Sequence, residues 1–157
     1  MLLLALSLAA QTALPPCRPA QLRIALDGKD GDFNGMSHAG TQVALRNAGA
    51  ACTLPALPVV EFRDARGRPL AAHRRPPVGM HPGPAMLPVR LARGQQVTMD
   101  LRWVSGPVYP SSRKLSAASI AVRVGGGTVR APMVAELYRE AGKPAAFDQT
   151  PLHDDSD

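Results

Sequence analysis

The 157-residue chain has few aromatic residues, only two cysteines and no apolar run long enough to cross a membrane. Aromatic residues make up 4% of the sequence, so no set of stacking side chains accompanies the arginines, and nucleic-acid binding is not expected. The two cysteines form no Cys-x-x-Cys motif, which removes the usual signature of a redox or zinc site. The longest apolar run covers the start of the chain and is far shorter than the roughly 20 residues of a transmembrane helix.

What is present suits one ordinary domain with an aliphatic core. Hydrophobic residues make up 45% of the chain, and Val, Leu, Ile, Ala and Met must supply most of the core. The net charge is +6, but the arginines are spread from Arg18 to Arg139 with one adjacent pair, Arg74-Arg75. This distribution indicates a solvated basic surface, and weak attraction to anionic lipid heads or envelope polymers is the alternative.

Residues 1–13 have the character of a signal peptide or leader. Leu2 to Ala10 are almost all apolar, and the small residues Ala9, Ala10 and Ala13 offer cleavage points, although the basic start of a standard signal peptide is missing. An N-terminal strand or a frayed tail is the alternative. The leader predicts an exported protein, periplasmic or secreted, with no transmembrane segment in the mature chain.

The rest of the sequence alternates as β-strands do. Val97, Met99, Leu101 and Trp103 alternate with polar residues, the clearest half-buried strand pattern in the chain. Similar patterns predict strands at 21–27, 42–46, 58–63, 89–91 and 119–124, with others beginning near 128 and around 134–138. A short helix over 133–140 is an alternative for the last of these.

Turn residues separate these segments. The Gly-Gly-Gly run at 125–127 predicts a hairpin turn, because no helix follows it that could make a phosphate-binding loop. Long loops are expected at 71–88 and 105–114, where prolines interrupt the pattern. Together these features predict an all-β protein, an immunoglobulin-like antiparallel β-sandwich of 7–8 strands over residues 17–140, followed by a flexible tail over 141–157.

Cys17 and Cys52 lie on either side of the first two expected strands. Cys17 precedes the first expected strand and Cys52 follows the turn after the second. Because export places the chain in an oxidising compartment, we expect the two to form a structural disulfide, worth about 3–4 kcal/mol on the chain-entropy model. A redox or metal role is the alternative, without a Cys/His cluster to support it.

A family resemblance runs through the same segment. Cys17-x-x-x-Gln21-Leu22 is followed by the run from Val43 to Gly49, then by Cys52-Thr53-Leu54, 58–60, 64–67 and 89–94. In this order the motifs over residues 17–104 resemble the domain-of-unknown-function family 4232, which occurs in exported and lipid-anchored bacterial proteins. The resemblance implies an immunoglobulin-like sandwich outside the cytoplasm with its cysteines bridged, and it implies no known activity. Two departures are Ala56, where the family usually has glycine, and the absence of a further cysteine in the loop 105–114.

Asp30, Asp32 and Asn34 form the sharpest local motif. Oxygen ligands at alternate positions followed by Gly35 match the first half of a calcium-binding loop. Thr41 occupies the position where a glutamate would close the site, and no helix precedes the loop. A polar turn between strands is the alternative.

The methionines and histidines suggest a second metal. Met36 with His38, and Met80-His81 with Met86, offer thioether and imidazole ligands suited to copper. Gap-filling methionines and ordinary loop histidines are the alternative.

No arrangement of nucleophile and base is recognisable around Ser111, Ser112 or the four histidines, so an enzyme is not expected. The sequence predicts an exported, disulfide-stapled binding or structural module of the bacterial cell envelope. Its partner would be an envelope protein, a polymer or a lipid surface. The alternative is an extracytoplasmic metal-binding protein, with calcium at Asp30–Gly35 or copper at the Met/His loop.

Overall fold

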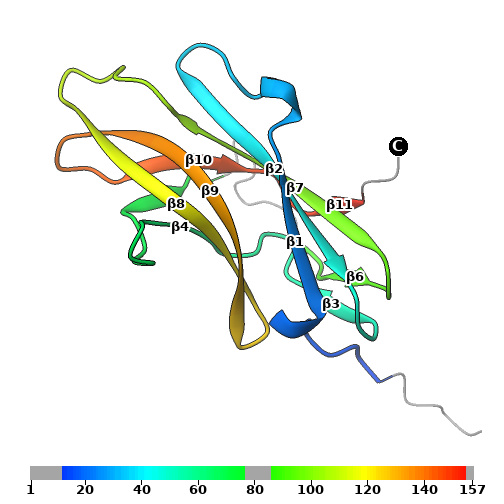
Figure 1. The fold of residues 1–157 in the computed structure, drawn as a ribbon. Coiled ribbons are helices and arrows are strands. Elements are labelled where there is room, and N and C mark those ends of the chain that lie inside the picture. The colour runs from blue at the N-terminus through cyan, green and yellow to red at the C-terminus, as the bar shows by residue number, and fades with distance from the viewer. Residues whose placement is uncertain (1–11, 77–85, 155–157) are drawn as a thin grey trace, which may run out of the picture.

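The computed structural model describes residues 12–76 and 86–154, which form eleven strands and two short 3-10 helices (Figure 1). The elements in chain order are η1 (Pro19–Gln21), β1 (Leu22–Asp27), η2 (Lys29–Gly31), β2 (His38–Asn47), β3 (Cys52–Leu54), β4 (Val60–Arg63), β5 (Ala72–Arg74), β6 (Val89–Leu91), β7 (Gln96–Val104), β8 (Ser112–Val124), β9 (Gly127–Glu140), β10 (Ala145–Gln149) and β11 (His153–Asp154). The all-β fold predicted from the sequence is therefore confirmed. Within the described ranges no helix has the length and apolar character needed to span a bilayer.

Two larger sheets form the layers of a sandwich. One sheet has the order β1-β2-β7-β10-β5, with β11 also paired to β7, and the other has the order β4-β8-β9. β3 and β6 form a separate two-stranded sheet at one end. β9 of the second sheet lies beside β1 and also approaches β7 and β10 of the first, so the two layers contact each other at several strands (Figure 1). All strand pairs are antiparallel except β5 with β10, which is parallel.

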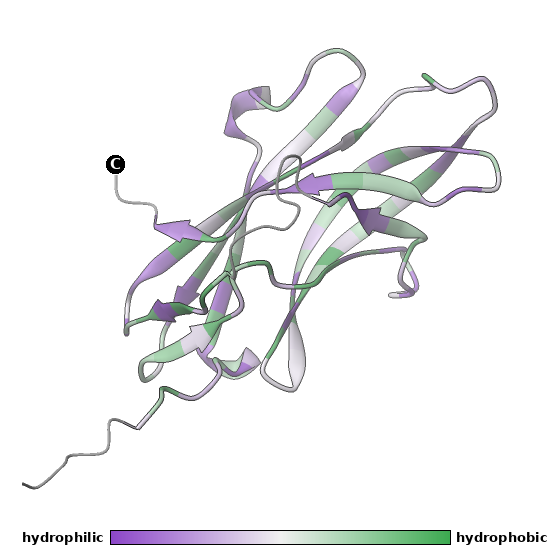
Figure 2. Ribbon diagram, turned by 180° about the vertical axis from the view of Figure 1, so that it is seen from behind, coloured by the Kyte–Doolittle hydropathy of each residue, from purple (hydrophilic) through white to green (hydrophobic). Residues whose placement is uncertain are grey.

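Strand alternation builds the core between the layers. Val97, Met99, Leu101 and Trp103 of β7 are all buried, as their spacing predicts. The facing sheet contributes buried side chains from every strand: Val60, Phe62, Ala117, Ile120, Val122, Val124, Val129, Ala131, Ala135 and Leu137. Apolar and polar bands alternate along these strands in Figure 2. Burial of about 25 cal/mol per Å² of apolar surface makes this core the main stabilising term.

Three of the few aromatic side chains join the two layers. Phe62 of β4 packs edge-to-face against Trp103 of β7, with ring centroids 5.4 Å apart, and against Phe147 of β10 at 5.1 Å. All three side chains are buried. Each such pair adds about 0.5–1.5 kcal/mol of stability beyond that of area burial. Half of the six aromatic residues of the chain therefore stabilise the contact between the two layers.

The segment assigned from sequence to a flexible tail, 141–157, contains two strands. Phe147 of β10 is buried between β5 and β7, and Leu152 is buried as well. The sandwich therefore extends past residue 140, to 154 in the described part of the chain. β10 is short, with three inward positions, Ala145, Phe147 and Gln149, so its local pattern is weak and distant partners define it.

Other elements also differ from expectation. The described residues hold eleven strands, more than the 7–8 predicted, because the short strands β3, β5, β10 and β11 were not expected. The helix considered over 133–140 is wrong, since these residues belong to β9. The polar residue Thr98 alternates with the core residues of β7 but is fully buried. It lies under His153 of β11, whose Nε2 is 3.2 Å from the threonine Oγ1.

The hairpin predicted at Gly125–Gly127 is present and packs against the start of the domain. Val124 pairs with Gly127 across the β8–β9 turn, and Gly126 has φ +82°, which favours glycine. A Cβ on Gly125 would overlap the backbone carbonyl oxygen of Cys17, and one on Gly127 would lie 2.8 Å from Cγ of Pro19. The absence of side chains here lets the hairpin lie directly on residues 17–19.

The G125A variant should therefore lower the free energy of unfolding by about 1–3 kcal/mol, because the methyl group displaces the hairpin from Cys17. Urea unfolding measures this change. G28A is the matched control, because a Cβ on Gly28 would meet no atom within 4 Å and its φ is −74°. Equal stabilities of the two variants would contradict the close packing of the hairpin.

Candidate functional site

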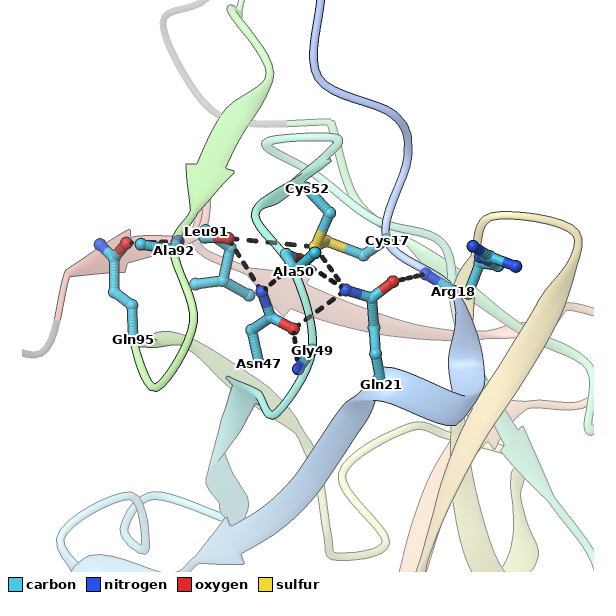
Figure 3. Close-up of a disulfide and its surroundings, with 10 residues drawn as sticks. All are labelled: Cys17, Arg18, Gln21, Asn47, Gly49, Ala50, Cys52, Leu91, Ala92 and Gln95. Carbon is cyan, nitrogen blue, oxygen red and sulfur yellow. Dashed lines mark hydrogen bonds between the residues drawn. A yellow bond between two sulfur atoms is a disulfide. The ribbon is translucent and has the colours of Figure 1, made fainter.

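Cys17 and Cys52 are joined in a disulfide, as expected from the sequence (Figure 3). The sulfur atoms are 2.00 Å apart, and both side chains are fully buried. Neither cysteine is a free thiol. The bridge therefore has a structural position and offers no nucleophile.

The bridge holds the N-terminal segment against β3. The backbone N–H of Cys17 donates to the carbonyl of Thr53, and the N–H of Thr53 donates to the carbonyl of Pro15, both at 2.9 Å. β3 pairs with β6 along its other edge. Both edges of β3 are thus occupied by backbone partners.

Asn47 is a buried hydrogen-bonding centre beside the disulfide. Its Nδ2 donates to the carbonyls of Leu91 and Ala50, both at 3.0 Å. Its Oδ1 accepts from the N–H of Gly49 at 2.9 Å and from Nε2 of Gln21 at 3.0 Å (Figure 3). The sequence alone does not reveal this centre, because the partners Leu91 on β6 and Gln21 on η1 are distant from Asn47 in the chain.

An open groove of about 930 Å³ lies next to this framework. One wall is the connection from β3 to β4, with Leu54, Ala56, Leu57 and Val59, and the other is the β8–β9 hairpin at 123–128. Pro16 and Pro88 also line it. Most of the exposed lining is apolar, and Val59 is 52% exposed, so the sandwich leaves apolar surface open to solvent here.

The groove wall between β3 and β4 is held by backbone contacts with the C-terminal segment and with β8. The N–H of Leu152 donates to the carbonyl of Ala56 at 2.8 Å, and the N–H of Arg123 donates to the carbonyl of Val59 at 2.9 Å. The first of these contacts comes from the segment that the sequence had assigned to the flexible tail. The groove is consequently a preformed feature of the fold.

A charged group stands at one side of the groove. Glu61 accepts from Arg63 at 2.7 Å and from Arg123 at 2.8 Å, and the Arg123 side chain is 63% exposed. The hydrogen bond from Arg63 is the main cause that lowers the pKa of Glu61 below its ordinary value of 4.5, partial burial opposes it, and Arg123 adds to the lowering. Two guanidinium groups share one carboxylate, so a positive charge remains at the groove.

The structure places two of the predicted calcium ligands, Asp30 and Asp32, in and just after η2. Asp30 lies in η2 with φ 52°, and Asp32 follows at its end. The neighbouring Lys29 places its ammonium 3.4 Å from Asp27. Across residues 12–76 and 86–154 there is no group of three or more His, Cys, Asp or Glu side chains able to hold a metal ion. The structure therefore gives the calcium interpretation no support.

Of the Met/His residues proposed for copper, Met36, His38 and Met86 lie in the described part of the chain. His38 begins β2 and has its Nδ1 2.8 Å from the backbone carbonyl of Met36, whose side chain is 93% exposed. Met86 lines the groove instead. Met80 and His81 lie outside the described residues.

Ser111 and Ser112, the two serines considered as nucleophiles, lie where β8 begins, and the Ser111 carbonyl accepts from the N–H of Ala141 at 2.8 Å. The Ser112 hydroxyl closes a turn through the backbone of Tyr109, at 3.0 and 3.1 Å. Thr98 has a histidine partner in His153, but the threonine is fully buried and out of reach of a substrate.

Replacing both cysteines, C17A/C52A, should lower the free energy of unfolding by about 2–5 kcal/mol, because the chain between them is no longer restrained. Guanidinium unfolding measures the change. Wild-type protein treated with a reductant should lose a similar amount. Unchanged stability after either treatment would show that the bridge is dispensable.

Acidification should expose the contribution of Glu61. Because its pKa is lower in the folded state than in the unfolded state, its stabilising effect is complete above pH 4.5 and is lost as pH falls through the folded pKa. The E61Q variant should therefore be less stable than wild type at pH 7, and the difference should shrink at pH 3. Urea unfolding at both values tests this.

E136Q is the matched control for that series. Glu136 lies on β9 with a half-exposed side chain paired to Lys114. Exposed pairs contribute little, so we expect a smaller loss at pH 7 than for E61Q. A difference between E61Q and wild type that does not change with pH would contradict the role given to the ion pairs.

Comparison with curated proteins and with solved structures gives no match. A family model does match, and it covers residues 17–152. This range begins at Cys17 and extends well beyond the motifs seen between 17 and 104, and it includes β8, β9 and β10. The chain therefore belongs to the family described as Domain of unknown function (DUF4232).

Proposed function

We propose that this protein is an exported, non-catalytic binding module of the bacterial cell envelope and that the groove beside the disulfide is its binding surface. The leader-like residues 1–13 support export. The buried Cys17–Cys52 bridge supports an oxidising compartment, since disulfides persist there and are rare in the cytosol.

The groove is the observation that carries the binding role. Its volume of about 930 Å³ is in the range of ligand sites, roughly 300–1,000 Å³. The bridge fixes Pro16 and Thr53 at its base, and Gly125 rests on Cys17. Walls held in this way need little ordering when a ligand binds, which favours affinity.

The lining residues support a non-catalytic role. Among residues 12–76 and 86–154, those that line the groove include no histidine, cysteine, aspartate or glutamate, and their polar side chains are Thr53, Thr128 and Arg123. Such a set supplies no general base near neutral pH to activate a hydroxyl or a water. Recognition, rather than proton transfer, is the chemistry that it can support.

Expression of the full chain in a bacterial host, with a C-terminal tag, tests export. We expect the protein in the envelope or medium fraction, with the Cys17 and Cys52 peptides linked in a non-reducing peptide map. L4R/L6R should retain the protein in the cytoplasm, because charges in the apolar run block export, whereas Q11R beyond that run should not. Wild-type protein found in the cytoplasm, or with free thiols after export, would refute the proposal.

A further inference from the structure

We propose that the groove binds the alkyl chain of a single-chain anionic lipid, with the head group of the lipid at Arg123. The inference rests on the proposed function, because it names the ligand class of the same groove. Four features of the described residues lead to it. The groove has apolar walls, no aromatic side chain lines it, the backbone groups named below already have hydrogen-bond partners, and its rim carries a positive charge.

The walls suit an alkyl chain. Leu54, Leu57, Val59, Val124 and Met86 line the groove with aliphatic or thioether side chains. None of the aromatic residues of the chain lines it, although aromatic faces are the usual platform for sugar rings. An envelope glycan would therefore find neither a stacking surface nor many hydrogen-bonding side chains here.

The backbone of the walls does not suit an extended peptide. The N–H and C=O groups of Thr53 are taken by the N-terminal segment, and the carbonyls of Ala56 and Val59 accept from Leu152 and Arg123. A peptide strand needs a free sheet edge to satisfy its own amides, and unpaired buried amides are costly. An alkyl chain carries no such groups, so the observations favour it over a peptide.

The rim supplies the charge. Arg123 lines the groove and its guanidinium is mostly exposed. Its partner Glu61 is also bound by Arg63, so this cluster keeps one positive charge beside an apolar surface. Phosphate and carboxylate heads pair with guanidinium groups through charge-assisted hydrogen bonds. The net charge of +6 favours approach to anionic lipid surfaces as well.

Titration calorimetry with three probes below their micellar concentrations tests the inference. Dodecyl phosphate has an alkyl chain and a charged head, dodecyl maltoside has the same chain with an uncharged head, and inorganic phosphate is the charged head without a chain. We expect one dodecyl phosphate per protein, binding to dodecyl maltoside weaker by about fivefold, as for one exposed ion pair, and no detectable heat with phosphate.

Two variants locate the site. R123Q should lower the affinity for dodecyl phosphate to that for dodecyl maltoside, and it should leave the affinity for dodecyl maltoside unchanged. R113Q, near the other end of β8, should change the affinity for neither probe. The second variant is V59E. It places a carboxylate on an exposed position of the groove wall and should abolish binding of dodecyl phosphate, because the wall is then charged. V134E is its control, because Val134 is 96% exposed on β9 and does not line the groove. Thermal unfolding confirms that all four variants are folded.

Each outcome decides the inference. It is overturned if no alkyl probe binds, if the head alone binds as well as dodecyl phosphate, or if R123Q and R113Q behave alike. Export is measured separately, so the two proposals fail independently. If the protein is exported but binds no alkyl probe, the lipid proposal is refuted and the envelope role is retained. If the protein is cytoplasmic but binds dodecyl phosphate, the envelope role is refuted and the lipid proposal is retained.

Discussion

The bond between Cys17 and Cys52 is the constraint on which the rest of this structure depends. It ties the first described segment to β3, and the backbone hydrogen bonds of Thr53 extend that tie over residues 15–17. The β8–β9 hairpin then rests on the Cys17 carbonyl through Gly125. The groove forms where these parts meet, so one covalent bond positions its base and, indirectly, both of its walls.

The remaining stability comes from packing between two layers with very few aromatic rings. Phe62 contacts both Trp103 and Phe147 and so links the β4-β8-β9 sheet to the sheet that contains β7 and β10. Asn47 has a comparable role among polar groups, because its four hydrogen bonds join the end of β2 to β6, to η1 and to the following turn at Gly49 and Ala50. Besides this packed middle and this polar end, the groove is a place where apolar surface stays open to solvent.

Much of the fold could be predicted from alternation alone. The strands around Leu22, Val43, Phe62, Leu101 and Ile120 repeat with a period of two and appear as β1, β2, β4, β7 and β8. β5, β10 and β11 could not be predicted, because each is short and forms only by pairing with residues far away in the chain. Local propensity carries little information about such strands, since their stability lies in the neighbours they acquire.

The sequence by itself determined the fold class, the basic charge and the pairing of two cysteines, because these follow from composition, periodicity and the existence of a single possible bridge. It pointed to Asp30, Asp32 and Asn34 as the first place to seek a ligand, and the structure brings no metal-binding group together there among the described residues. Only the tertiary structure decided where a groove opens and that Arg123 stands at its side. The groove joins residues near 16, 55, 87 and 125. No local pattern can report a surface made from segments so far apart, because long-range contacts alone create it.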